Sequence, residues 1–101
     1  MTAPASTHKE SYYQAKILQY LKRTYPAAFV WKAAAGPYSR CGIPDVCMVL
    51  DGQFYGFEVK RPEVGLLSKI QEQTIKAINA AGGIVGVVSY PEDVERILKG
   101  G

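Results

Sequence analysis

The chain has 101 residues, of which 48% are hydrophobic and 21% charged, and its formal net charge is +3. This composition is typical of one folded domain and excludes an intrinsically disordered chain. No apolar run approaches the roughly 18 residues of a membrane-spanning helix, and residues 1–10 lack the apolar core of a signal peptide. The mild positive charge permits nucleic-acid binding without requiring it.

The two cysteines, Cys41 and Cys47, are too few for a disulfide framework, and their spacing matches no zinc motif. We therefore expect a cytoplasmic protein with reduced thiols and no membrane association, in the host cytoplasm if its origin is viral. Residues 1–6 are predicted to form a flexible arm, and residues 7–101 a single domain.

The first predicted element is a helix that follows the arm. Thr7 and Glu10 have the spacing of a capping box, and Pro26 ends the helical pattern. Residues 28–34 favour a strand, whereas residues 36–44 contain two glycines and two prolines and predict a loop. The apolar stripe of the helix consists of Tyr13, Ile17, Tyr20 and Leu21.

A β-hairpin is the clearest local signal in the chain. Residues 45–50 and 53–60 are rich in strand-forming residues and flank Asp51-Gly52, which is typical of a two-residue type I′ turn. Apolar residues occupy both faces, so we expect helices to cover the sheet on both sides. Val46, Met48, Phe57 and Val59 share one face, and Cys47, Val49 and Phe54 share the other.

The second half of the chain predicts a helix, a strand and a final helix. Ser68 and Gln71 form a second candidate capping box, and glycines 82–83 end that helix. Residues 84–89 predict a short buried strand, and Pro91 suits the first turn of the last helix. The predicted order is α-β-β-β-α-β-α. The inward stripe expected for the middle helix consists of Ile70, Thr74, Ala77, Ile78 and Ala81.

The predicted hairpin brings charged residues together at its open end. A two-residue turn pairs Leu50 with Gln53, and the same register places Asp45 opposite Glu58, with Cβ atoms about 4.5 to 5.5 Å apart. Lys60 leaves the same face because side chains alternate along a strand. A shift of one residue in the register would separate these groups.

Two carboxylates and an ammonium group suggest a magnesium site. Mg²⁺ prefers carboxylate oxygens and water, and the backbone carbonyl of Val59 would be a further ligand. At such a site a cation activates water and neutralises a phosphodiester, while Lys60 serves as a general base or stabilises developing charge. The alternative is structural: Asp45 leaves a loop, and Glu58 and Lys60 form an exposed ion pair on an edge strand.

These residues resemble a known signature. Pro44-Asp45, followed by Glu58-Val59-Lys60, is similar to the motif of the PD-(D/E)xK nucleases, and the surrounding sequence resembles the virus-type replication-repair nuclease domain, VRR-Nuc, over about residues 10–90. The flanking segments that carry the resemblance are Gly42-Ile43-Pro44-Asp45, Asp51-Gly52-Gln53-Phe54, Phe57-Glu58-Val59-Lys60-Arg61-Pro62, Leu67-Ser68-x-x-Gln71 and Ala81-Gly82-Gly83.

The resemblance implies a restriction-endonuclease-like α/β core, with a mixed four-stranded sheet flanked by helices. It implies that Asp45 and Glu58 bind Mg²⁺ or Mn²⁺, that Lys60 serves catalysis, and that Glu10 completes the acidic site, directly or through water. Gln71 would support the site from the second helix. Glu10 and Gln71 are also the expected N3 residues of the two capping boxes, and the two roles are compatible.

The resemblance also implies a partner and an assembly. Compact stand-alone members resemble Holliday-junction resolvases, which act as homodimers on branched DNA such as four-way junctions, and the short chain fits that type. The sequence therefore predicts a metal-dependent DNA endonuclease. One alternative is a catalytically silent DNA-binding module of the same fold, and a second is a protein-interaction domain whose charges only cap strand ends.

Several other residues are weaker candidates for DNA contacts. They are Tyr38, Ser39 and Arg40 in the glycine- and proline-rich loop, and Arg61 and Lys69 beyond the hairpin. Further lysines and arginines, including Lys16, Lys22 and Arg23, are interpreted mainly as surface charges. The aromatic residues Tyr12, Tyr13, Tyr20 and Trp31 are interpreted as core or interface packing rather than as platforms for bases.

Overall fold

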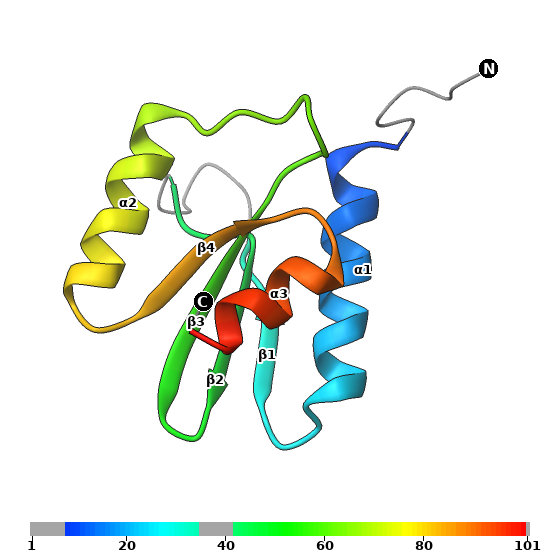
Figure 1. Ribbon diagram of the computed structural model, residues 1–101, viewed down its shortest axis with the longest axis vertical. Coiled ribbons are helices and arrows are strands. Elements are labelled where there is room, and N and C mark those ends of the chain that lie inside the picture. Colours follow the sequence, from blue (N-terminus) through cyan, green and yellow to red (C-terminus); the bar gives the residue numbers. More distant parts are fainter. Residues whose placement is uncertain (1–7, 35–41, 101) are drawn as a thin grey trace.

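A mixed four-stranded sheet with helices on both sides forms the protein, in a computed structural model that describes residues 8–34 and 42–100 (Figure 1). The strand order is β1-β2-β3-β4, with the first three strands antiparallel and β4 parallel to β3. This confirms the predicted element order and the mixed sheet. The elements are α1 (Glu10–Thr24), β1 (Phe29–Lys32), β2 (Val46–Leu50), β3 (Gln53–Val59), α2 (Lys69–Ala80), β4 (Ile84–Val88) and α3 (Pro91–Leu98).

The turn between β2 and β3 sets the register of the hairpin. Asp51 and Gly52 both have positive φ, 52° and 77°, as a type I′ turn requires. Leu50 pairs with Gln53 and Val46 with Phe57, which confirms the predicted register. Asp45, one residue before β2, therefore lies beside Glu58 of β3.

The main core lies on the face of the sheet that α1 and α3 cover (Figure 1). Every second residue of β2 and β3 points into it, as alternation along a strand requires. The structure confirms the face predicted for Val46, Met48, Phe57 and Val59, and these four residues are completely buried. The core consists of Tyr13, Ile17, Leu21, Val46, Met48, Phe57, Val59, Val88 and Val94.

The opposite face is covered less completely than the sequence predicts. Helix α2 packs against β4, and none of its residues is buried. Ile70, Ala77 and Ala81 are exposed, so the predicted inward stripe is wrong at these positions; the half-buried residues of this helix are Gln71, Thr74, Ile75 and Ile78. The reason is that, within the described part of the chain, α2 packs mainly against the edge strand β4 rather than against β1 and β2.

The helix starts follow the predicted signals in two of three cases. Ser68 and Gln71 form the predicted capping box of α2, and Pro91 is the first residue of α3. The predicted box at α1 is wrong, because Lys9 is the N-cap and Glu10 is already the first helical residue; Thr7 lies outside the described residues. Within residues 8–34 and 42–100, no helix has the length and apolar character needed to cross a bilayer.

Candidate functional site

Asp45 and Glu58 lie together at the end of the β2–β3 hairpin, away from its turn. The backbone N–H of Val59 donates a hydrogen bond to Oδ2 of Asp45 at 2.8 Å. The carbonyl of Asp45 accepts a hydrogen bond from the N–H of Ala33 at 2.9 Å. The chain segments that follow β1 and end β3 thus hold Asp45 in place, although it lies outside the regular strand.

Two close contacts hold the segment that leads into Asp45. Gly42 has φ +81°, and a Cβ there would lie 2.9 Å from the backbone oxygen of Ile70 in α2. A Cβ on Gly56 would lie 2.9 Å from Cγ of Pro44, so only glycine lets the proline pack directly on β3. The sequence predicts a loop here, but it does not predict this packing.

Glu58 is completely buried, which excludes the exposed ion pair considered from the sequence. Its Oε1 accepts a hydrogen bond from Nε2 of Gln71 at 2.8 Å, whereas its Oε2 has no hydrogen-bond partner among the described residues. Burial first, and then the charge of Asp45, raise the pKa of Glu58 to about 8. When protonated, Glu58 can donate a hydrogen bond to Asp45.

Gln71 forms the predicted capping box and also contacts Glu58, while its part in catalysis stays a prediction. Its side-chain Oε1 accepts a hydrogen bond from the backbone N–H of Ser68 at 2.9 Å, and its backbone N–H donates one to Oγ of Ser68 at 3.2 Å. Because the capping box uses the amide oxygen, the amide nitrogen is left to face Glu58. The start of α2 therefore orients a carboxylate on the neighbouring strand.

Lys60 and Glu10 form the rim of the site. Nζ of Lys60 lies 3.7 Å from Oε1 of Glu10, and the Lys60 side chain is 13% exposed. The hydroxyl of Ser89 donates to the Lys60 carbonyl at 2.6 Å, which ties the end of β3 to the end of β4. Among the described residues, no group of three His, Cys, Asp or Glu could hold a metal. Glu10 thus faces Lys60, and its predicted part in metal binding stays a prediction.

The donor set suits a small divalent cation bound by oxygen. Among the described residues the buried Oε2 of Glu58 has no hydrogen-bond donor, and the raised pKa of Glu58 is that of a carboxyl group for which a positive charge alongside, from a proton or a cation, is favourable. Burial, and then the charges of Asp45 and Glu58, raise the pKa of nearby Cys47 to about 11, so its thiol is neutral at pH 7. Asp45 and Glu58 fit the ligand roles expected from the sequence, and these roles, like that of the Val59 carbonyl, stay predictions.

The predicted DNA contacts are only partly described. Tyr38, Ser39 and Arg40 lie outside the described residues. Arg61 and Lys69 are exposed, Arg61 directly after Lys60 and Lys69 at the first position of α2. Both stay candidates for phosphate contacts.

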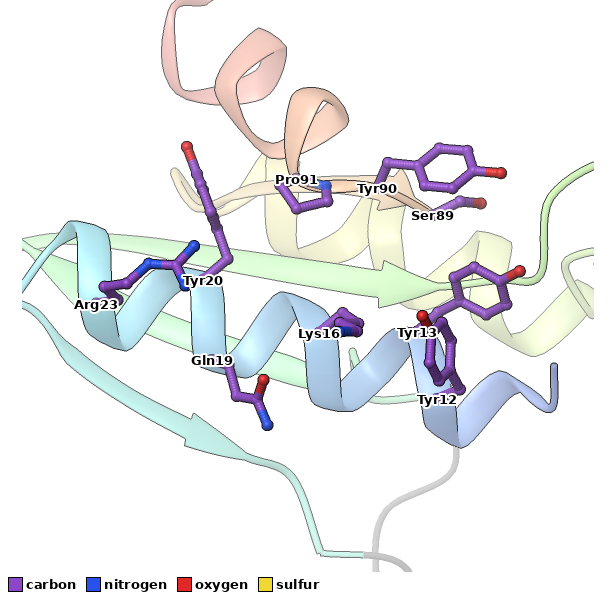
Figure 2. A pocket seen from close by; sticks show the side chains of 9 residues that line it. All are labelled: Tyr12, Tyr13, Lys16, Gln19, Tyr20, Arg23, Ser89, Tyr90 and Pro91. Carbon is purple, nitrogen blue, oxygen red and sulfur yellow. The ribbon is translucent and has the colours of Figure 1, made fainter.

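The sequence analysis missed a groove beside the site, between α1 and the β4–α3 junction (Figure 2). Tyr13 is buried, as expected, but Tyr12 is 40% exposed and lines this groove. A signal was present: Tyr12, Lys16, Gln19 and Arg23 recur at helical spacing, next to the apolar stripe.

Comparison with known proteins supports the fold. No protein-family model matches the sequence, and no curated protein matches it. A solved structure described as a "VRR_NUC domain" is similar, with a TM-score of 0.66 and 24% sequence identity over 85% of this chain and 94% of that chain. The protein therefore has the fold of a VRR_NUC domain, the restriction-endonuclease-like α/β core that the sequence resemblance implied.

Proposed function

We propose that the protein is a VRR-Nuc nuclease that uses Mg²⁺ or Mn²⁺ to hydrolyse phosphodiester bonds in DNA. The observation that carries the proposal is the completely buried Glu58 beside the half-buried Asp45, with Lys60 next to them, in a chain with the fold of a VRR_NUC domain. A buried carboxylate without a cation destabilises a small domain, so its presence calls for a functional reason.

Each residue of the site has a distinct role in the proposed reaction. Asp45 and Glu58 would hold the cation, and Gln71 keeps the Glu58 carboxylate turned toward Asp45. Bound there, a divalent cation neutralises phosphate oxygens and lowers the pKa of a water molecule. Lys60, held by its ion pair with Glu10, donates hydrogen bonds to the attacked phosphate and stabilises the charge that develops on it.

We further propose branched DNA as the substrate and a homodimer as the active form. The proposed substrate and the proposed dimer both rest on the resemblance to compact junction-resolving nucleases. A two-fold dimer places two sites at a fixed separation, which suits paired cuts in a four-way junction. The exposed ring of Phe29 and the half-buried ring of Trp31, on the face of β1 and β2 against which α2 does not mainly pack, are compatible with a second copy at that surface.

Cleavage of a labelled four-way junction tests the proposal. We expect product with Mg²⁺ or Mn²⁺ and none with EDTA. Asp45→Asn and Lys60→Ala should each lower the rate by about 100-fold or more, because each removes a charge at the reacting phosphate. Glu72→Gln and Lys76→Ala are matched controls, since both residues are exposed on α2 outside the site, and they should cut as the wild type does.

The alternative is a DNA-binding module that performs no chemistry. One observation favours it: Glu10 does not join Asp45 and Glu58 in a group of three acids among the described residues. Junction binding by the wild type, with no product under any metal condition, would establish this alternative and overturn the nuclease proposal.

A further inference from the structure

The groove between α1 and the β4–α3 junction adjoins the candidate catalytic site. Ser89 lines the groove and also donates its hydroxyl hydrogen to the carbonyl of Lys60 at 2.6 Å. Tyr12, at the same end, lies two residues after Glu10 on α1. The groove therefore reaches the backbone of Lys60 and the first turn of α1, which carries Glu10, and it has a volume of about 280 Å³.

The charge of the groove favours an anionic ligand. Lys16 and Arg23 line it about two turns of α1 apart, and its described lining includes no aspartate or glutamate (Figure 2). The nearby carboxylate of Glu95 already accepts hydrogen bonds from the hydroxyl groups of Tyr20 and Tyr25. Two cations spaced along one helix suit the repeated charges of a phosphate backbone.

Exposed aromatic rings lie at the end of the groove nearest the site. Tyr90 is 44% exposed and Tyr12 is 40% exposed. The buried Tyr13 stands between them, with ring centroids 5.2 Å from Tyr12 and 6.0 Å from Tyr90, both in edge-to-face geometry. Tyr13 thus anchors both rings. The Tyr12 ring also stacks on His8, with centroids 3.8 Å apart, and Nζ of Lys16 lies 5.4 Å from its centroid, so Tyr90 carries the more accessible ring of the two.

We propose that this groove binds a single-stranded segment of the DNA substrate, next to the phosphate that is cut. Aromatic rings that accept unpaired bases, combined with cations that follow the backbone, are the usual elements of single-strand binding. A groove of about 280 Å³ accommodates a nucleotide but not a double helix, whose bases are already stacked on one another. The inference rests on the proposed nuclease function and adds a substrate class: DNA with an unpaired strand at the cleavage point.

Binding without metal tests the groove separately from catalysis. Fluorescence anisotropy in EDTA would compare a labelled oligothymidylate of about 12 nucleotides with a duplex of the same length. Tyr90→Ala should weaken binding of the single strand about tenfold, because one base–ring stack is lost. Tyr90→Phe keeps the ring and should stay within about twofold of the wild type. Neither change should alter duplex binding.

The salt dependence tests the two cations. Lys16→Ala and Arg23→Ala should each reduce the slope of log affinity against log salt by about 0.7 for the single strand. Lys22→Ala is the matched control, because Lys22 is an exposed lysine of α1 that does not line the groove, and it should leave the slope unchanged.

The outcomes separate this inference from the nuclease proposal. Unchanged single-strand affinity in Tyr90→Ala, or equal losses for single strand and duplex, would overturn the groove assignment even if metal-dependent cleavage is found. Selective loss of single-strand binding in the groove variants would support it even if no DNA is cut. A melting temperature close to that of the wild type confirms that each variant is folded.

Discussion

Glu58 is the residue on which the chemistry of the site depends. It is a completely buried carboxyl group in a central strand, with Gln71 as a hydrogen-bond donor on one oxygen and Asp45 near the other. Its pKa rises from an ordinary value of 4.5 to about 8, mainly through burial and then through the charge of Asp45. Without metal, the folded protein therefore holds a proton at pH 7 that the unfolded chain releases.

This shift predicts a specific pH dependence of stability. In EDTA, the protonated Glu58 contributes fully to the free energy of unfolding below pH 4.5, and this contribution is lost as the pH rises toward 8. For one proton the loss is at most about 1.4 kcal/mol per pH unit. Glu58→Gln removes this titration, so the stability of the variant relative to the wild type should increase from pH 6 to pH 8.5. Denaturant unfolding at both values measures the difference, and a difference independent of pH would contradict the assigned shift.

Metal binding should compete with protonation of Glu58. A cation at Asp45 and Glu58 requires the charged form of both, so Mn²⁺ should raise the melting temperature of the wild type more at pH 8.5 than at pH 6. Asp45→Asn should abolish most of this increase, whereas Glu72→Gln, an exposed acid on α2, should retain it. The readout requires no DNA. If Mn²⁺ raised the melting temperature of Asp45→Asn as much as that of the wild type, the metal would bind at another site.

At the scale of elements, the packing of Pro44 on Gly56 positions Asp45 beside Glu58, the proposed metal-binding pair. The added methyl group of Gly56→Ala would lie 2.9 Å from Cγ of Pro44 and 3.1 Å from Cγ2 of Val85. Overpacking of this kind costs about 1 to 3 kcal/mol. Moving Pro44 also moves Asp45, so both the free energy of unfolding and the rate of DNA cleavage should fall.

A double-mutant cycle tests whether the contact with Pro44 causes the loss of stability in Gly56→Ala. Pro44→Ala removes the Cγ that causes the closest contact, so Gly56→Ala should destabilise the Pro44→Ala background less than it destabilises the wild type. Strictly additive losses in unfolding free energy would show that the proline is not the obstacle.

The elements that the sequence predicts correctly are those set by local interactions. The Asp51-Gly52 turn determines the register, and the register alone places Asp45 beside Glu58. The capping box of α2 is likewise a contact between near neighbours in sequence, Ser68 and Gln71. Periodicity could not show that α2 packs mainly against β4 and reaches β3 through the hydrogen bond from Gln71 to Glu58, because the pattern of one helix does not say which strand it covers. The contact of Pro44 with Gly56 joins distant residues and leaves no periodic signal.

At the scale of the whole molecule, one face of the sheet remains open beside α2. Phe29 is 70% exposed and Val49 is 38% exposed, and both share a face with Cys47. Trp31 bridges Phe29 and Phe54 there, with ring centroids 5.4 and 6.4 Å away. We call these four residues, Phe29, Trp31, Val49 and Phe54, the open-face cluster. Phe29 and Val49 are exposed, whereas Trp31 and Phe54 are half-buried. The open-face cluster is the surface at which we expect the proposed dimer to form, because grouped apolar side chains that are partly exposed mark interaction sites.

Replacement of one ring in the open-face cluster should separate assembly from chemistry. Phe29→Ser should shift the dimer toward monomer in equilibrium sedimentation, because it removes the most exposed aromatic contact. The monomer should still nick DNA with Mg²⁺, since Asp45, Glu58 and Lys60 all come from one chain, but paired cuts in a four-way junction should become single nicks. Leu66→Ser is the matched control, because Leu66 is 85% exposed outside the cluster and its loss should leave the dimer intact. A wild type that sediments only as a monomer would show that any junction cleavage proceeds one strand at a time.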